Sequence, residues 1–446
     1  MAQTVTLAIE RMGQSGDGVG RMPDGRLVFV PGALPGESVA VEVTEERSKF
    51  SRARLVRVLT PSPTRIKPVC PIFGICGGCA FQHWQYPEEL RYKENRVREA
   101  LRRYGHDVVA LQSIRGSDNP YGYRNKGQFP FGGVAGEITL GLYQRNSHEV
   151  VEATHCDIQD DLVNRVLEQA AEIANQSGLA PYDESRRSGI LRHLLIRSSR
   201  LQRRALVLVV VYADHPGLLA FAQSLMRRVP EVAGVGLSIN QRTDNRVLGD
   251  ATRLLAGEPY IMETILGASF RLSFTSFFQV NPEQAAVLYQ IALDFLPPHC
   301  DELWDLYSGV GTLATLASSR TKMVRAIEVN EEAGADAEIN FSLNGRTNIV
   351  MEKGRVQDLV KRWLDSGIKS PDAVIVDPPR SGLDGVVVDA LQALRPSRII
   401  YVSCNPETWA RDIRLLAPAY ELSSAIPVDM FPRTDHVEVA SLLVSR

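Results

Sequence analysis

The strongest constraint on the fold is the alternation of strand-like and helical segments after about residue 284. An amphipathic stretch, EQAAVLYQIALDFL, is followed by short apolar segments that alternate with helical ones. The strand candidates are ELWDLY, MVRAIEV, NIVMEKG, AVIVDPP, RIIYVSC and finally EVASLLV. Strands that alternate with helices build a doubly wound, mainly parallel sheet, because each parallel connection needs a crossover. The sequence therefore predicts an α/β fold for the C-terminal part of the chain.

The remainder of the chain requires at least one further domain. With 446 residues, the chain exceeds what one hydrophobic core usually supports. Residues 1–60 contain short strand-like runs separated by glycine-rich turns, which is typical of a small antiparallel barrel. PSPTRIKP is typical of a linker, and residues 120–265 are β-rich with one helical stretch, DLVNRVLEQAAEIANQ. We predict a barrel over 1–60, a β-rich central domain over 61–265 and an α/β domain over 266–446.

Charge and hydropathy limit the partners and the compartment. The formal net charge is -2, so a nucleic acid would be held by local basic patches. RSKFSRARLVR, from Arg47, carries five basic residues and Phe50, and fits either a solvated strand face or a phosphate-binding stripe. The first residues lack the pattern of a signal peptide, and the densest apolar run, ALVLVVVYA, is too short to span a bilayer. We expect a cytoplasmic protein without a membrane partner.

A glycine loop predicts a nucleotide-like ligand. DLYSGVGTLA, from Asp305, follows a strand and opens a helix, and its glycines let the backbone turn sharply beside a ligand. A dinucleotide fingerprint needs a third glycine, whereas TLA follows Gly311 here. S-adenosylmethionine has no pyrophosphate and needs less of that cradle, although NAD or a bare tight turn also fit the glycines alone. Glu328 ends the next strand, where it can accept hydrogen bonds from ribose hydroxyls.

Three further residues lie where strands leave the predicted sheet. Asp377, in VDPPRSG, should face the ligand crevice, because open α/β sheets bind ligands at the carboxyl ends of their strands. Cys404, in IIYVSCNPE, is a candidate soft nucleophile, although a lone cysteine is more often a small buried hydrophobe. Cys300 has no motif and keeps that second interpretation. Glu438 precedes the last apolar run, where a desolvated carboxylate suits proton abstraction, and His436 is a rival base.

The other cysteines form a candidate metal site. Cys70, Cys76 and Cys79 lie in CPIFGICGGC, and Cys156, in THCDIQ, is the candidate fourth ligand. Six cysteines in a chain of this length do not make a disulfide scaffold. Four sulfurs suit either zinc or an iron–sulfur cluster.

Together these motifs resemble the RNA uridine-5 methyltransferase family, in particular its iron–sulfur branch that modifies 23S ribosomal RNA. DPPR, SCNP and the terminal HVE follow one another here in the order of that family, and the resemblance covers nearly the whole chain. It implies a TRAM barrel at the N-terminus, a central RNA-binding domain with an iron–sulfur site and a Rossmann-like methyltransferase domain. The family's glycine motif often reads DLFCG, whereas this chain has DLYSG, a difference that matters little if the backbone makes the contacts.

The resemblance also assigns roles to single residues. It makes Cys404 the nucleophile and Glu438 the base. It implies a 4Fe–4S cluster on the four clustered cysteines, Cys70, Cys76, Cys79 and Cys156. It places contacts to S-adenosyl-L-methionine on Gln279, Tyr307, Gly309, Thr312, Glu328 and Asp377.

The resulting expectation is methylation of carbon 5 of a uridine in structured RNA, through a covalent cysteine–uracil intermediate. The resemblance favours 23S rRNA as the substrate, and the same chemistry on the T-loop uridine of tRNA is the main rival. Two rivals from other classes are a non-catalytic RNA-binding iron–sulfur protein and a DNA cytosine methyltransferase. The latter normally carries its nucleophile in a Pro-Cys context, whereas Cys404 follows a serine. No protein partner is implied.

Overall fold

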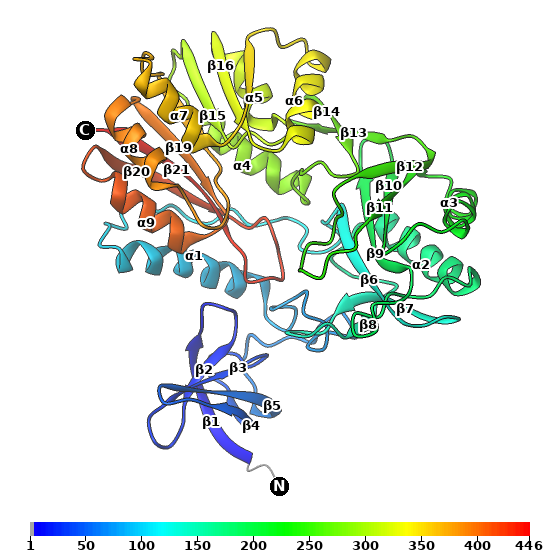
Figure 1. The fold of residues 1–446 in the computed structure, drawn as a ribbon. Coiled ribbons are helices and arrows are strands. Elements are labelled where there is room, and N and C mark those ends of the chain that lie inside the picture. Colours follow the sequence, from blue (N-terminus) through cyan, green and yellow to red (C-terminus); the bar gives the residue numbers. More distant parts are fainter. Residues whose placement is uncertain (1–3) are drawn as a thin grey trace.

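The computed structural model describes residues 4–446, which form three parts (Figure 1). The first part is a closed barrel with the strand order β1-β2-β3-β5-β4. Its strands are β1 (Thr4–Met12), β2 (Gly18–Arg21), β3 (Leu27–Val30), β4 (Ser38–Glu46) and β5 (Phe50–Thr60). The pairs are antiparallel except for β3 and β5, which run parallel. Alternating apolar side chains such as Leu7, Ile9, Val39 and Val41 fill the interior, so the predicted barrel is confirmed.

The central part is a seven-stranded sheet with two helices on one face. The strand order is β12-β11-β10-β9-β6-β7-β8. The elements are β6 (Lys126–Val134), β7 (Glu137–Tyr143), β8 (Val150–Glu152), α2 (Asp161–Gln176), β9 (Leu191–Ser199), β10 (Arg204–Val211), α3 (Gly217–Arg228), β11 (Val232–Ile239) and β12 (Thr252–Gly257). Helix α2 was predicted and α3 was not, because α3 begins at a glycine after Pro216 without a side-chain cap.

The C-terminal part is a second seven-stranded sheet, with the order β17-β16-β15-β18-β19-β21-β20. After the hairpin of β13 (Tyr260–Ile265) and β14 (Ala268–Ser273), its elements are α4 (Pro282–Asp294), β15 (Glu302–Leu306), α5 (Thr312–Ala317), β16 (Met323–Glu328), α6 (Glu331–Leu343), β17 (Ile349–Lys353), α7 (Val356–Asp365), β18 (Ala373–Val376), α8 (Gly385–Leu394), β19 (Arg398–Ser403), α9 (Pro406–Leu416), β20 (Tyr420–Val428) and β21 (Glu438–Ser445).

The direction of these strands confirms the predicted α/β fold. The first five strands of the order are parallel, and β21 lies antiparallel between β19 and β20. Strand β20, YELSSAIPV, escaped prediction because two serines and a proline interrupt its apolar pattern. Within residues 4–446, no helix is long and apolar enough to cross a membrane.

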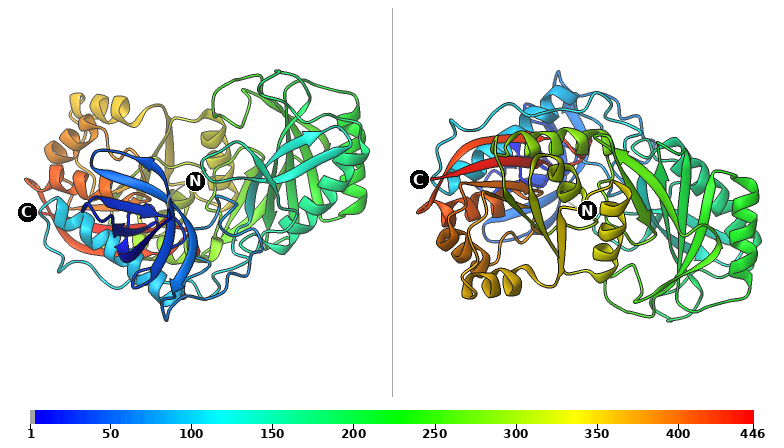
Figure 2. Two further views of the ribbon diagram at one scale, coloured as in Figure 1. Left: turned by 90° about the horizontal axis from the view of Figure 1, so that it is seen from below. Right: turned by 90° about the horizontal axis from the view of Figure 1, so that it is seen from above.

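Helix α1 (Tyr86–Arg103) lies against the C-terminal sheet although it precedes the central sheet in sequence (Figures 1 and 2). Its Val97, Ala100 and Leu101 belong to the same buried cluster as Trp409 and Tyr420. The segment after it pairs with β20 through bridges that join Leu111 to Ala425 and Arg115 to Val428. We therefore propose that the predicted central domain, 61–265, is interrupted by a segment that packs with the C-terminal part.

Candidate active site

Five neighbouring strands bring the predicted catalytic and cofactor residues to one edge of the C-terminal sheet. Parallel strands end at the same edge, and the antiparallel β21 begins there. Following the strand order β16, β15, β18, β19 and β21, the residues at this edge are Glu328, Tyr307, Asp377, Cys404 and Glu438. The topology thus unites residues that are more than a hundred positions apart in the chain.

The glycine loop is shaped to leave room beside its backbone. Tyr307 has a φ of 74°, a left-handed conformation that is strained for a bulky residue and is typical of functional loops. A Cβ atom on Gly309 would meet nothing within 4 Å, whereas one on Gly311 would collide with Phe341. Open space therefore lies beside Gly309, and Gly311 is required by packing. Thr312 is the first residue of α5 and is 7% exposed.

The acid of β16 is tied to this loop. The backbone N–H of Gly309 donates to Glu328 Oε2 at 2.8 Å, and that of Asn330 donates to Oε1 at 2.8 Å. Each carboxylate oxygen has a second lone pair, so Glu328 can still accept hydrogen bonds from a ligand. Below the loop, buried Asp305 accepts hydrogen bonds from Ser308 Oγ at 2.9 Å and from the Ala314 N–H at 3.0 Å. The hydrogen bonds to Glu328 and to Asp305 thereby fix the loop before any ligand binds.

The DPPR loop is held by the helix that follows Cys404. Asn405 Nδ2 and Thr408 Oγ1 both donate to the backbone carbonyl of Arg380, at 3.1 Å each. Asp412, also in α9, accepts the Leu383 N–H at 2.7 Å. Sequence reasoning assigned no role to Arg380, yet its guanidinium is the cation that opposes the carboxylates around Cys404 and Glu438. It also lies 3.4 Å from His436 Nε2, so His436 contacts Arg380 from beside the site.

Cys404, Asp377 and Glu438 lie near enough for charge on one to change the ionisation of another. Burial raises the pKa of the Cys404 thiol to about 11, and the charges of Glu438 and Asp377 add to the effect. Burial and the Asp377 charge raise the pKa of Glu438 to about 8, and burial raises that of Asp377 to about 7. Two neighbouring carboxyl groups that resist ionisation are typical of acid–base sites. Within this arrangement, the side chain of Glu438 is only 4% exposed and points inward.

Gln279 approaches the same edge from the segment before α4. It is 7% exposed and its side chain contacts the hydroxyl of Tyr289. Burial raises the pKa of Tyr289, and the charges of Asp377, Glu438 and Asp305 add to this shift. Tyr289 was not predicted, since a tyrosine in an amphipathic helix carries no sequence signal of its own. All predicted catalytic and cofactor residues thus lie around one edge of the sheet.

The loop of residues 429–437, between β20 and β21, leads directly into Glu438 and is held from outside the C-terminal sheet. The backbone carbonyl of Met430 accepts a hydrogen bond from Asn281 Nδ2 at 3.1 Å, and that of Phe431 accepts one from Lys93 Nζ at 3.1 Å. The carbonyl of Pro432 accepts a hydrogen bond from the Tyr123 hydroxyl at 2.9 Å. The carbonyl of Arg433 accepts from the backbone N–H groups of Ala80 and Phe81, at 2.8 and 3.0 Å. The position of the loop therefore depends on residues far earlier in the chain.

A buried ionic network anchors the start of this loop. Lys93 Nζ, in α1, lies 2.7 Å from both Glu89 Oε1 and Asp429 Oδ1, and none of the three side chains is exposed. The Tyr86 hydroxyl donates to Asp429 Oδ2 at 2.8 Å. The two carboxylates raise the pKa of Lys93 against the effect of burial, so the ammonium stays charged. Arg433 Nη1 also lies 3.5 Å from Glu89 Oε2, so two cations match two carboxylates, and the network joins α1 to the catalytic half without a net buried charge.

We expect Lys93→Met to destabilise the protein by about 3–5 kcal/mol, because two buried carboxylates would lose their shared cation. Urea unfolding followed by circular dichroism measures this change. Arg102→Met is the matched control, since Arg102 is exposed on the same helix and should shift stability by less than about 0.5 kcal/mol. Equal unfolding midpoints for Lys93→Met and the wild type would contradict the network.

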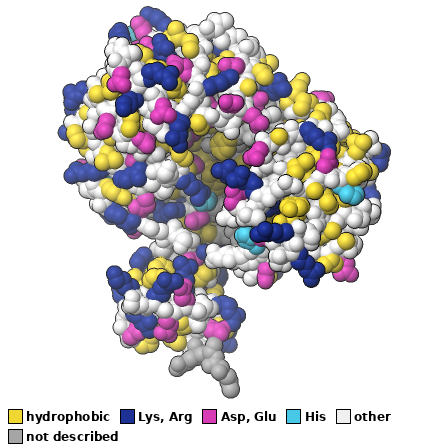
Figure 3. All heavy atoms as spheres, in the orientation of Figure 1, with side chains coloured by type: hydrophobic (Ala, Val, Ile, Leu, Met, Phe, Trp, Pro, Cys, Tyr) yellow, Lys and Arg dark blue, Asp and Glu magenta, His cyan; other side chains and the backbone are white. Residues whose placement is uncertain are grey.

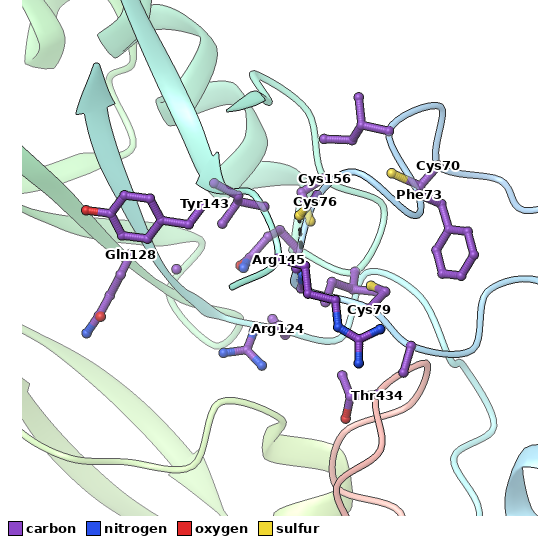
Figure 4. A pocket seen from close by; sticks show the side chains of 18 of the residues that line it. Cys70, Phe73, Cys76, Cys79, Arg124, Gln128, Tyr143, Arg145, Cys156 and Thr434 are labelled. Atoms are coloured by element: carbon purple, nitrogen blue, oxygen red, sulfur yellow. Dashed lines mark hydrogen bonds between the residues drawn. The ribbon is translucent and has the colours of Figure 1, made fainter. Parts of the chain in front are cut away.

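The four clustered cysteines line one cavity of about 1040 Å³ (Figure 4). Cys76, Cys79 and Cys156 lie close together, and Cys70 is on a neighbouring loop. All four thiols are free, and burial raises the pKa of Cys79 to about 12. Within residues 4–446, however, no three His, Cys, Asp or Glu side chains are placed to hold a metal ion. The structure therefore does not support the predicted metal site, although four free thiols on one cavity are a donor set that an iron–sulfur cluster accepts.

The basic run from Arg47 is largely compensated in the barrel. Arg52 and Arg47 both lie near Glu45, at 3.5 and 2.5 Å, and Arg54 pairs with Glu42. These exposed pairs contribute little to stability, but they reduce the positive charge of the strand. This pattern fits a solvated strand face more closely than an uncompensated phosphate-binding stripe.

Comparisons with known proteins agree with this geometry. A family model described as tRNA (Uracil-5-)-methyltransferase matches residues 250–446, and a TRAM domain model matches residues 2–56. An RNA methyltransferase of Listeria innocua, otherwise uncharacterised, is 36% identical over 444 residues, covering 99% of this chain and 97% of the relative. One of Caldanaerobacter subterraneus is 37% identical over 438 residues, covering 98% and 96%. The chain belongs to this RNA methyltransferase family.

Membership confirms the family and the enzyme class that the motifs predicted. Among solved structures, the tRNA (uracil-54, C5)-methyltransferase of Pyrococcus abyssi in complex with S-adenosyl-L-homocysteine matches with a TM-score of 0.80 and 26% identity. The match covers 99% of this chain and all of that one. The Pyrococcus abyssi structure thus holds S-adenosyl-L-homocysteine, and membership of a family of RNA methyltransferases does not support a non-catalytic RNA-binding role for this chain.

Proposed function

We propose that this RNA methyltransferase methylates carbon 5 of a uridine in structured RNA through a transient bond between Cys404 and the pyrimidine ring. The observation that carries the proposal is the convergence of the Cys404 thiol with the Glu438 and Asp377 carboxyls at adjacent strand ends. The glycine loop and Glu328 lie on the next two strands, where a cofactor would be held. A thiol beside a buried base and a cofactor loop is the set of groups that this covalent route requires.

The proposed reaction proceeds in three steps. The Cys404 thiolate adds to carbon 6 of uracil, which converts the ring to an enolate that is nucleophilic at carbon 5. Carbon 5 takes the methyl group that bound S-adenosylmethionine supplies, and S-adenosylhomocysteine leaves. Glu438 then removes the proton from carbon 5, the bond between carbon 6 and sulfur breaks, and Cys404 regains its electron pair.

The protonation states in the free protein define what must change when the substrates bind. Because the pKa of Cys404 is about 11, its thiol is neutral near pH 7 and must lose its proton as the substrates bind. Arg380 favours the thiolate, and a bound cationic sulfonium would favour it further. Glu438, with a pKa of about 8, is mostly protonated near pH 7, so it must also lose its proton before it can accept one from carbon 5.

The cofactor contacts that we propose follow from the loop geometry. Gly309 leaves open space for the ligand, and Glu328 keeps free lone pairs for ribose hydroxyls. Gln279, Tyr307, Thr312 and Asp377 surround the same edge of the sheet and would complete the binding site.

We propose 23S rRNA as the first candidate substrate and the T-loop uridine of tRNA as the second. The sequence motifs favour the first, and the similarity to the Pyrococcus abyssi tRNA enzyme favours the second. Comparing 5-methyluridine positions in the RNA of cells with and without this protein tests the proposal. We expect one or more positions to lose the methyl group without the protein. An unchanged modification map would refute RNA uridine methylation, and the position lost identifies the substrate.

We also propose that Cys70, Cys76, Cys79 and Cys156 bind a 4Fe–4S cluster. Support comes from the four free thiols around one cavity, because each thiolate of such a cluster binds a different iron and the sulfurs need not meet at one point. The methyl transfer itself moves no electron, so the cluster would be structural. Anaerobic purification should give a brown protein with iron and sulfide, whereas a colourless protein with zinc would rule the cluster out.

A further inference from the structure

Two cations lie opposite each other in the central sheet, and neither forms an ion pair within the described residues. Lys126 of β6 is directly opposite Arg197 of β9 in the antiparallel ladder, so both side chains lie on the same face of the sheet. Lys126 takes part in no hydrogen bond or ion pair within the described residues, and Arg197 forms no ion pair there. Like charges placed directly opposite one another destabilise a sheet unless something compensates them.

The guanidinium of Arg197 is also short of hydrogen-bond partners. Its side chain is 3% exposed, and its Nη2 donates to the carbonyl of Ser276. Its Nε and Nη1 atoms are buried and lack partners. Buried donors without partners are costly, and native proteins rarely leave them so. The charges of Glu263 and Asp336 favour the guanidinium, but within residues 4–446 no acceptor reaches these two donors, so the site is short of hydrogen-bond acceptors.

Lys126 lies at the wall of the large cavity, beside the candidate active site, whereas Arg197 is buried behind it. Lys126 lines the cavity together with Arg124, which likewise has no ion pair among residues 4–446. The same cavity is lined by Phe278 and Val280, on either side of Gln279, and by His436, two residues before Glu438. Figure 3 shows the hollow between the central and C-terminal parts, with Lys and Arg side chains at its mouth. Its wall thus runs from the central sheet to the residues that flank the catalytic base.

We propose that Lys126 and Arg124, with the charge of Arg197 beside Lys126, bind a backbone phosphate of the RNA beside the target uridine. A phosphodiester carries one negative charge and several acceptor oxygens, which match the unneutralised cations and the free donors. An uncharged base could not compensate the charge. Holding a flanking phosphate fixes the register of the strand while the target base leaves its stack. The inference rests on RNA being the substrate, as proposed above, but not on the covalent step.

The free protein should carry a stability cost at this site. Burial and the charges of Arg197 and Arg124 lower the pKa of Lys126 to about 7, because nothing nearby favours its charged form. Lys93 presents the opposite case, since its ammonium lies between two carboxylates. The same substitution at the two lysines should therefore change stability in opposite directions.

Lys126→Met tests the inference, with Lys93→Met and Lys126→Arg as matched variants. Filter binding with 23S rRNA and total tRNA, both from cells lacking the protein, should show affinity for the substrate RNA reduced about tenfold. The slope of log affinity against log salt should become less negative by about one. The Tm of Lys126→Met should rise by about 2 °C, whereas that of Lys93→Met should fall. Lys126→Arg should keep most of the RNA affinity.

Three outcomes would overturn the inference. One is an unchanged RNA affinity and salt slope in Lys126→Met. Another is that Lys126→Met binds S-adenosylhomocysteine more weakly and RNA normally, which would show that the cations bind the carboxylate of the cofactor. The third is a lower Tm for Lys126→Met, which would show that Lys126 is paired in solution. Because binding is measured without turnover, failure of the covalent mechanism leaves these results interpretable.

Discussion

Replacing the Cys404 sulfur with oxygen should abolish turnover. In Cys404→Ser, incorporation of tritiated methyl groups into RNA from cells lacking the protein should fall by about 10³-fold or more. A serine hydroxyl is far less acidic and less nucleophilic than a thiol, and Arg380 alone cannot ionise it beside the two carboxyl groups of Glu438 and Asp377. Affinity for S-adenosylhomocysteine should stay near the wild-type value, because the cofactor loop is on other strands.

Cys300→Ser is the matched control for this experiment. Cys300 is 5% exposed, lies just before β15 and has only a weak contact to the carbonyl of Glu302, at 3.7 Å, which a hydroxyl can keep. We expect this variant to retain most of the wild-type rate. Normal methylation by Cys404→Ser would remove the thiol from the reaction.

Glu438→Gln should trap the enzyme on its substrate. An amide cannot take the proton from carbon 5, so the ring would receive its methyl group and remain bound to Cys404. We expect turnover to fall by about 10²–10⁴-fold and an RNA–protein adduct to survive denaturing electrophoresis. Cys404→Ser/Glu438→Gln is the control, because the adduct requires the sulfur.

The pH dependence provides an independent check on the same residue. Glu438 is protonated below its pKa of about 8, and only the ionised form accepts a proton. The wild-type rate should therefore rise as the pH increases through about 8, and this inflection should be missing in Glu438→Gln. Two results together would contradict this assignment: no RNA–protein adduct from Glu438→Gln, and such an adduct from His436→Asn. They would make His436 the base.

The edge of the C-terminal sheet could be predicted from sequence because its signals are local. Each candidate follows an apolar strand, and parallel strands end at one edge, so Cys404, Asp377 and Glu328 were expected to lie together. The network around Lys93 carries no such signal. Glu89 and Lys93 are spaced like an exposed i, i+4 pair in a densely charged helix, and the third member, Asp429, is 336 positions away. Nothing local distinguishes a buried lysine from a solvated one.

The cysteines illustrate a different limit. Their spacing identified a set of donors, but it could not fix how the loops of Cys70 and Cys156 approach one another. Lys126 was missed for the opposite reason, because one lysine in a strand usually lies in solvent. Its interest arises only from its partner across the ladder, Arg197, and from the lack of an ion pair at Lys126 within residues 4–446.

The anchoring of the 429–437 loop has a consequence for how this chain matures on the ribosome. Helix α1 is made early, yet its buried ammonium meets Asp429 only when the last strands emerge. Until then α1 exposes an apolar face, and the pair of Glu89 and Lys93 lacks Asp429 and the C-terminal sheet that buries it. Native docking of the N-terminal third must therefore wait for the end of synthesis, and nascent chains released shortly before residue 429 should be captured by chaperones or degraded.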